Sequence, residues 1–103
     1  MKKTLSIIFG LFIGITSYTQ TLNVVNGKVL DADAAKPISG VHVFVQNTDI
    51  SQKTELDGTF ILQNVPNGAH IVVFKQIGYE TQYFPIDLND KNLNIGDVML
   101  YID

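Results

Sequence analysis

The chain has 103 residues, no cysteine, and 7 lysine or arginine residues against 10 aspartate and glutamate residues, which gives a net charge of −3. This length provides for one domain. The absence of cysteine excludes disulfide cross-links, a cysteine nucleophile and lipid attachment to an N-terminal cysteine. The acidic balance argues against nucleic acid and against anionic membrane surfaces as partners, because both require a basic contact surface.

The N-terminal segment has the order of a secretory signal peptide. Residues 1–3 are positively charged, residues 5–15 form an apolar run, and residues 17–19 place small side chains at the first and third positions. A retained membrane anchor is the weaker alternative, because a spanning helix needs about 20 apolar residues. We therefore expect a signal peptide over residues 1–19 and a mature domain without a transmembrane segment over residues 20–103. The expected location is periplasmic, outer-membrane-associated or extracellular.

The rest of the chain alternates apolar and polar residues over short runs, which is the pattern of half-buried β-strands. The predicted strands cover residues 27–31, 41–46, 51–56, 59–63, 69–75, 79–86 and 95–102, after a lead-in of strand character over residues 20–26. Turn signals at Asp57-Gly58 and at residues 66–68 separate three of the apolar runs. We expect the stretch from Val41 to Phe74 to form an antiparallel meander.

The pattern also predicts where several strands lie. Residues 51–56 are polar and favour an edge strand, whereas residues 69–75 are apolar on both faces and favour a central one. The last strand should turn Val98, Leu100 and Ile102 towards the core. No stretch after the signal peptide keeps a helical apolar period over three turns. The predicted fold is an all-β, antiparallel sandwich of about seven strands.

The turn signatures occur in the order of a known domain family. They are Gly27-Lys28-Val29, Pro37-Ile38-Ser39-Gly40-Val41, Thr54, Asp57-Gly58-Thr59-Phe60, Val65-Pro66-Asn67-Gly68 and Gly78-Tyr79. With this order and spacing, the chain resembles the carboxypeptidase regulatory-like domain. The resemblance implies a transthyretin-like (prealbumin-like) sandwich of two sheets, in which Val43, Phe60, Leu62 and Tyr79 fill the space between the sheets. Glu55 departs from the aspartate that commonly follows the threonine, which weakens any carboxylate site there.

The resemblance also carries expectations about context. Domains of this family follow the catalytic domain of some metallocarboxypeptidases, extend the N-terminus of bacterial TonB-dependent outer-membrane transporters, or occur as small secreted proteins. It therefore implies an envelope protein or an outer-membrane transporter as a partner. The chain is either a small protein of this kind or the extension of a transporter. We expect the former, because the last predicted strand is followed by almost no sequence.

Few residues have the chemistry of a catalytic or metal site. His42 and His70 are the two histidines, and neither accompanies a cysteine or a Gly-x-Ser-x-Gly nucleophile. A zinc pair would require both to share a face, and no third ligand cluster accompanies them. Glu55 and Asp57 beside Gly58 allow a calcium interpretation, but an aspartate that caps its own hairpin turn is favoured. We expect no catalytic residue, no metal site and no cofactor.

Aromatic residues are frequent in the C-terminal part of the chain. Tyr79, Tyr83, Phe84 and Tyr101 could together offer ring faces to a sugar or a peptide. Packing within the sandwich is the favoured alternative, because aromatic side chains suit strand positions. Tyr79 and Tyr83 are retained as candidate ligand contacts.

These observations favour a secreted, non-catalytic β-sandwich that serves as an accessory or interaction module of the bacterial cell envelope, associated with TonB-dependent nutrient uptake. The alternative is a carbohydrate- or peptide-binding module. An enzyme is disfavoured. The transthyretin-like hydroxyisourate hydrolases need arginine and end in Tyr-Arg-Gly-Ser, whereas this chain has no arginine and ends in Tyr101-Ile102-Asp103. The zinc-binding catalytic domain of a carboxypeptidase is also missing from the sequence.

Overall fold

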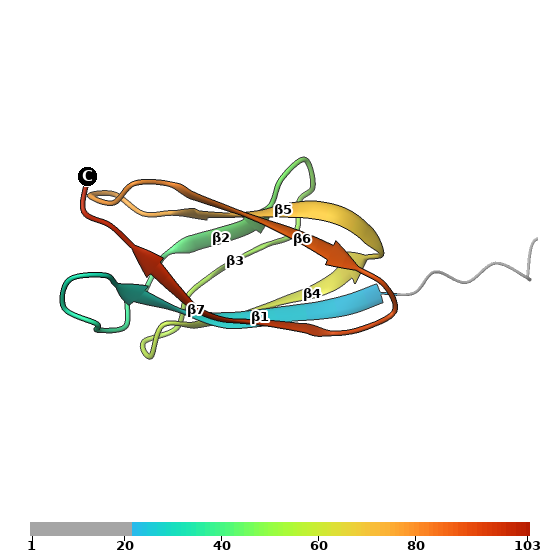
Figure 1. The fold of residues 1–103 in the computed structure, drawn as a ribbon, viewed down its shortest axis with the longest axis horizontal. Coiled ribbons are helices and arrows are strands. Elements are labelled where there is room, and N and C mark those ends of the chain that lie inside the picture. The colour runs from blue at the N-terminus through green and yellow to red at the C-terminus, as the bar shows by residue number, and fades with distance from the viewer. Residues whose placement is uncertain (1–21) are drawn as a thin grey trace, which may run out of the picture.

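Seven strands in two facing sheets make up residues 22–103, the part of the chain that the computed structural model describes. The strands are β1 (Leu22–Asp31), β2 (His42–Val45), β3 (Ser51–Lys53), β4 (Thr59–Pro66), β5 (Gly68–Lys75), β6 (Gln82–Leu88) and β7 (Leu93–Leu100). One sheet has the order β4-β1-β7 and the other the order β3-β2-β5-β6. Figure 1 shows β1 and β7 in one layer and β2 and β5 in the layer facing it. The predicted all-β sandwich is confirmed.

The predicted signal peptide over residues 1–19, and the first two residues of the predicted domain over residues 20–103, lie outside the described residues. From residue 22 onward, no helix has the length and apolar character needed to cross a membrane.

The positions of two strands within the sheets agree with the sequence pattern. β5 is an inner strand with β2 on one side and β6 on the other, as expected for a run that is apolar on both faces. β3 is an edge strand, although it covers three residues of the predicted six. β6 forms the other edge of this sheet and contains Pro85, a residue that cannot donate a backbone hydrogen bond.

Two features of the predicted topology are wrong. The stretch from Val41 to Phe74 is not a meander, because β4 crosses to the other sheet and pairs with β1, while β2 pairs directly with β5. In addition, β1 and β7 run parallel instead of antiparallel. The physical reason is that alternation assigns residues to a face of a sheet, whereas it does not select the neighbouring strand.

The hydrophobic core fills the space between the sheets. Phe60 on β4 meets Phe74 on β5 edge to face, with ring centroids 5.4 Å apart and planes at 72°, an arrangement that the charge distribution of aromatic rings favours. The other apolar side chains that are fully buried are Val25, Val29, Val41, Val43, Val45, Leu62, Val65, Val72 and Leu100. Each such burial contributes about 1.5–3 kcal/mol for the larger side chains. The inward positions predicted for Val43, Phe60 and Leu62 are confirmed.

Both neighbours of β1 depart from regular pairing. The register of β1 shifts by one residue against β4 and again against β7. The extra residue of β4 coincides with Asn64, at φ 62°, and that of β7 with Gly96, at φ 87°. This left-handed backbone is accessible to glycine and, among other residues, most readily to asparagine. Such bulges bend and twist the strand that carries them.

Several strand boundaries differ from the prediction. β1 begins at Leu22, five residues before the predicted start at residue 27, and β7 begins at Leu93, two residues before the predicted start at residue 95. Leu100 is fully buried as expected, but β7 ends there. Ile102 is 61% exposed, so its predicted inward position is wrong. Beyond the end of the strand, Ile102 instead forms an isolated bridge with Tyr79.

Candidate functional site

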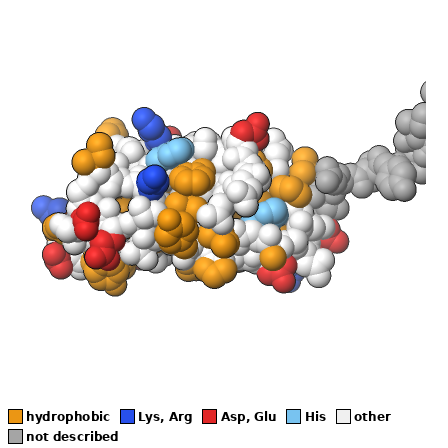
Figure 2. Space-filling view, turned by 90° about the horizontal axis from the view of Figure 1, so that it is seen from above, with side chains coloured by type: hydrophobic (Ala, Val, Ile, Leu, Met, Phe, Trp, Pro, Cys, Tyr) orange, Lys and Arg blue, Asp and Glu red, His pale blue; other side chains and the backbone are white. Residues whose placement is uncertain are grey.

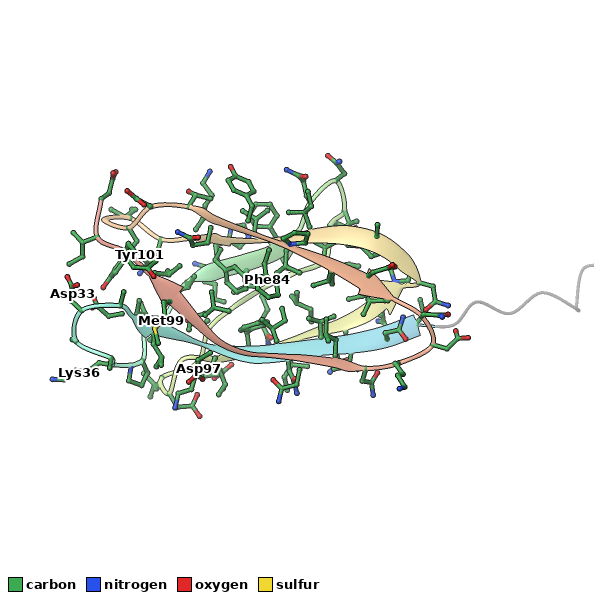
Figure 3. The ribbon with its side chains drawn as sticks, in the orientation of Figure 1. Asp33, Lys36, Phe84, Asp97, Met99 and Tyr101 are labelled. Carbon is green, nitrogen blue, oxygen red and sulfur yellow. The ribbon has the colours of Figure 1, made fainter. Side chains whose placement is uncertain are left out.

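Tyr79 lies at the end of the sandwich where the chain terminates. Its hydroxyl donates a 2.6 Å hydrogen bond to Oδ2 of Asp31, the last residue of β1. The half-buried ring packs against the core, which confirms a core contact for Tyr79 but not a place between the sheets. Figure 3 labels three further residues at this end, Asp33, Lys36 and Tyr101. Tyr79 thus joins the bend before β6 to the first strand.

The carboxylate of Asp31 accepts three hydrogen bonds. Besides the Tyr79 hydroxyl, the backbone N–H groups of Asp33 and Ala34 each donate to its Oδ1 at 2.8 Å. The Tyr79 hydroxyl and then these N–H groups lower the pKa of Asp31 below its ordinary value of 3.8, because they stabilise the ionised form. The same bond to Asp31 raises the pKa of Tyr79 above its ordinary value of 10.0. The hydrogen bond therefore favours an ionised carboxylate at Asp31 and a neutral phenol at Tyr79.

Tyr83 has a different environment from Tyr79. It lies opposite Val73 on β5 and projects from the outer face of the four-stranded sheet, where 61% of its surface is exposed. Phe84, labelled in Figure 3, alternates with Tyr83 and lies opposite the buried Val72, on the inner side of the sheet. The structure therefore does not bring Tyr79 and Tyr83 together at one surface. A ligand-contacting role for these tyrosines stays a prediction.

The two histidines lie on opposite faces of the four-stranded sheet. His42 is paired with Lys75 on the outer face, whereas His70, five positions before Lys75 on β5, takes the inner side. Nε2 of His70 is 2.9 Å from the carbonyl oxygen of Pro66, a contact within the β4–β5 turn. A shared zinc site is therefore not formed by this pair. Within residues 22–103, no group of three or more His, Cys, Asp or Glu side chains could hold a metal ion.

The acidic turn before β4 has a structural explanation. Oδ1 of Asp57 accepts hydrogen bonds from the backbone N–H of Thr59 at 3.1 Å and from the Thr59 hydroxyl at 2.6 Å. These bonds, the hydroxyl first, lower the pKa of Asp57 below its ordinary value of 3.8. Gly58 takes φ 82°, which glycine adopts without steric cost. The prediction that this aspartate caps its own turn is confirmed.

A row of basic side chains crosses the outer face of the four-stranded sheet. His42 on β2 lies opposite Lys53 on β3 and opposite Lys75 on β5. Directly paired residues project from the same face, and Val43, the next residue of β2, is fully buried in the core. The basic row, which comprises Lys53, His42 and Lys75, therefore faces outward. Three separate segments contribute to it, so only the strand register reveals it.

A second row, apolar in character, lies beside the first. Phe44 on β2 is opposite Val73 on β5, which is opposite Tyr83 on β6. The ring centroids of Phe44 and His42 are 4.8 Å apart, so the apolar row (Phe44, Val73 and Tyr83) touches the basic row. Figure 2 looks onto this side of the molecule and shows hydrophobic side chains next to lysine and histidine side chains.

Comparison with known proteins gives a family match and a relative for this chain. The family model of the CarboxypepD_reg-like domain matches residues 25–100 of this chain. A TonB-dependent receptor of Formosa agariphila is 39% identical over 62 residues, a segment that is 60% of this chain and 6% of the receptor. The chain thus corresponds to a small part of that relative.

Solved structures agree on the architecture. A chain of a type II Cohesin-X-Dockerin complex from Acetivibrio cellulolyticus superposes with a TM-score of 0.68 at 18% identity, over 78% of this chain and 58% of that one. The major pilin subunit BcpA of Bacillus cereus gives a TM-score of 0.61 at 10% identity, over 81% and 31%. Hydroxyquinol 1,2-dioxygenase from Pseudomonas putida gives 0.65 at 10%, over 84% and 58%.

At these identities the structural likeness shows the fold alone, and these differently named proteins share a β-sandwich without sharing an activity. The family match, in contrast, spans nearly the whole of the sandwich described above. The chain belongs to the CarboxypepD_reg-like domain family.

Proposed function

We propose that the chain is an exported, non-catalytic accessory module of the bacterial cell envelope that associates with a TonB-dependent transporter. The observation that carries the proposal is the 39% identity over 62 residues with a segment of a TonB-dependent receptor. The expected signal peptide over residues 1–19 supports export. Export is required for this association, because the transporter partner resides in the outer membrane. The module acts by binding its partner and not by catalysis.

The strand edges provide a physical route for this association. An extended segment of a partner can add a strand to an open sheet edge and gain backbone hydrogen bonds. β3 suits this poorly, because it is short and the Oε1 of its Gln52 accepts a 2.7 Å hydrogen bond from the backbone N–H of Ile61 on β4. β7 has eight residues and pairs with β1 on one side. We propose the outer edge of β7 as the docking edge.

Affinity purification from the native envelope tests the association. The tagged chain is expressed in its own cells, and outer membranes are solubilised in mild detergent before capture. A TonB-dependent receptor should be enriched relative to capture with a tagged, exported β-sandwich of similar size and charge. Recovery of the same proteins with both baits would contradict the proposed partner.

Two charge-reversal variants test the docking edge. Asp97→Lys reverses a charge on β7, where the side chain is exposed, and Asp87→Lys makes the same change on the edge strand β6. If β7 is the docking edge, the first variant loses the receptor and the second keeps it. Equal recovery with the two variants would show that the partner docks elsewhere.

A further inference from the structure

The basic row and the apolar row together form a surface for which the accessory role gives no explanation. Neighbouring strands are about 4.8 Å apart, so Lys53, His42 and Lys75 place three basic groups at a regular spacing across the sheet. The two lysine ammonium groups and the imidazole between them are hydrogen-bond donors on one face. Such a row suits an anionic ligand, because charge-assisted hydrogen bonds to an anion are stronger than neutral ones.

The charge of the surroundings strengthens this point. The chain as a whole has a net charge of −3. A hollow of about 500 Å³ nevertheless lies over the basic row, and no carboxylate of residues 22–103 lines it. Its lining residues are Gly40, His42, Lys53, Lys75, Gln76, Ile77 and Thr81. This face thus complements a negative ligand, although the whole molecule repels one.

The apolar row determines what kind of anion fits. Val73 lies at an outward position of β5 yet is 2% exposed, whereas Tyr83, opposite it on β6, is 61% exposed. Phe44, on the other side of Val73, is half-buried. Tyr83 is therefore accessible to a ligand at the end of the apolar row. The apolar face of a sugar ring can stack on such a ring, while a charged substituent reaches the neighbouring basic row.

An acidic peptide is the weaker occupant. A peptide in strand form gains affinity mainly from backbone hydrogen bonds at a sheet edge. The basic and apolar rows cross β2 and β5, which are inner strands already paired on both sides. An occupant of this face must therefore bind through ring faces and charged groups, which a chain of acidic sugars offers in every repeating unit.

We propose that the outer face of the four-stranded sheet binds a polyuronate, an anionic polysaccharide whose sugar units carry carboxylates. The carboxylates lie against Lys53, His42 and Lys75, and one sugar ring stacks on Tyr83. This role goes beyond association with a transporter and does not depend on it.

Titration of the purified protein with defined oligosaccharides tests the ligand class. Calorimetry or NMR should detect binding of an oligogalacturonate at low ionic strength, and salt should weaken it, because exposed charges are screened over about 10 Å at 0.1 M salt. A neutral galactan oligomer of equal length should not bind. Equal or tighter binding of the neutral oligomer, of a sulfated oligosaccharide or of poly-glutamate would overturn the assignment, as would no binding of the oligogalacturonate.

Matched variants test the surface. Lys53→Gln combined with Lys75→Gln should weaken oligogalacturonate binding about tenfold, the expected size for two exposed ion pairs, and Tyr83→Ala should weaken it as well. The control is Lys28→Gln combined with Lys91→Gln, which removes the same charge away from this sheet, from β1 and the β6–β7 turn. It should bind like the parent chain. Equal losses in the two lysine pairs would overturn the location, and unchanged NMR spectra of unliganded variants establish that each one folds.

Discussion

The hydroxyl of Tyr79 and the carboxylate of Asp31 form a 2.6 Å hydrogen bond between residues 48 positions apart in the chain. The bond fastens the bend before β6, in the four-stranded sheet, to the end of β1 in the three-stranded sheet. Its neighbours at this end include the backbone bond from Glu80 N–H to the Tyr101 carbonyl oxygen. It therefore helps to close one end of the sandwich.

Tyr79→Phe should lower the melting temperature near neutral pH. Asp31 has a depressed pKa, so the bond stabilises the fold above about pH 3.8 and is lost as the pH falls through the folded pKa. Tyr79 has a raised pKa, so the contribution of the bond to stability is complete below pH 10.0. It is lost as the pH rises through the pKa of Tyr79 in the folded state. The difference between parent and variant should shrink at both extremes. Thermal unfolding followed by circular dichroism across this pH range measures the effect.

Tyr83→Phe is the matched control for this experiment. It removes a hydroxyl from an exposed tyrosine on the outer face of the sheet. Its melting temperature should follow that of the parent chain at every pH. If Tyr79→Phe behaves in the same way as Tyr83→Phe, the bond to Asp31 contributes nothing to stability.

Gly27→Ala should destabilise the sandwich by about 1–3 kcal/mol, as overpacking of a tight site does. A Cβ at this position would lie 2.9 Å from the carbonyl oxygen of Gly96 and 2.9 Å from Cζ of Phe60. The first contact is with backbone and the second with a fully buried ring, so relieving either one requires a shift of the backbone or of the core. Urea unfolding gives the free energy. The neighbouring change Asn26→Ala, at a half-buried position, should cost clearly less, and the reverse order would refute the packing argument.

Thr54→Val should also weaken the fold, because its buried hydroxyl connects two segments. It accepts a 2.9 Å hydrogen bond from the N–H of Val41 and donates one of 2.6 Å to the carbonyl oxygen of Ile38. Valine leaves both backbone groups without this partner, at about 1–3 kcal/mol for each buried group left unpaired. Thr54→Ser keeps the hydroxyl and should recover most of the loss in the same urea experiment. A valine variant as stable as the serine variant would exclude this role.

Local sequence chemistry predicted the strands and turns well, because it depends on near neighbours. Asp57 caps its turn through Thr59, two residues away. Val43, which the family resemblance placed between the sheets, is fully buried on the inner face of β2. Such features follow from the two-residue period of a strand and from the backbone freedom of glycine, which any short window of sequence contains.

The sequence did not predict in the same way which strands pair with each other, because the paired residues lie far apart in the chain. Phe60 and Phe74 both belong to short apolar runs, yet they lie in opposite sheets. The parallel pairing of β1 with β7 joins residues near opposite ends of the described chain. The inward prediction for Ile102 extended the alternation of β7 past Leu100, where the strand ends. For the same reason, the basic row appeared only when the register placed Lys53 and Lys75 on either side of His42.

Crosslinking of lysine amines in intact native cells, followed by mass spectrometry, tests the accessory role most directly. Lys53 and Lys75 flank His42 on one face, so a crosslink between them reports that the folded chain has reacted. Given that internal crosslink, the account predicts further crosslinks from this chain to a TonB-dependent receptor. Recovery of the internal crosslink with none to such a receptor would contradict it.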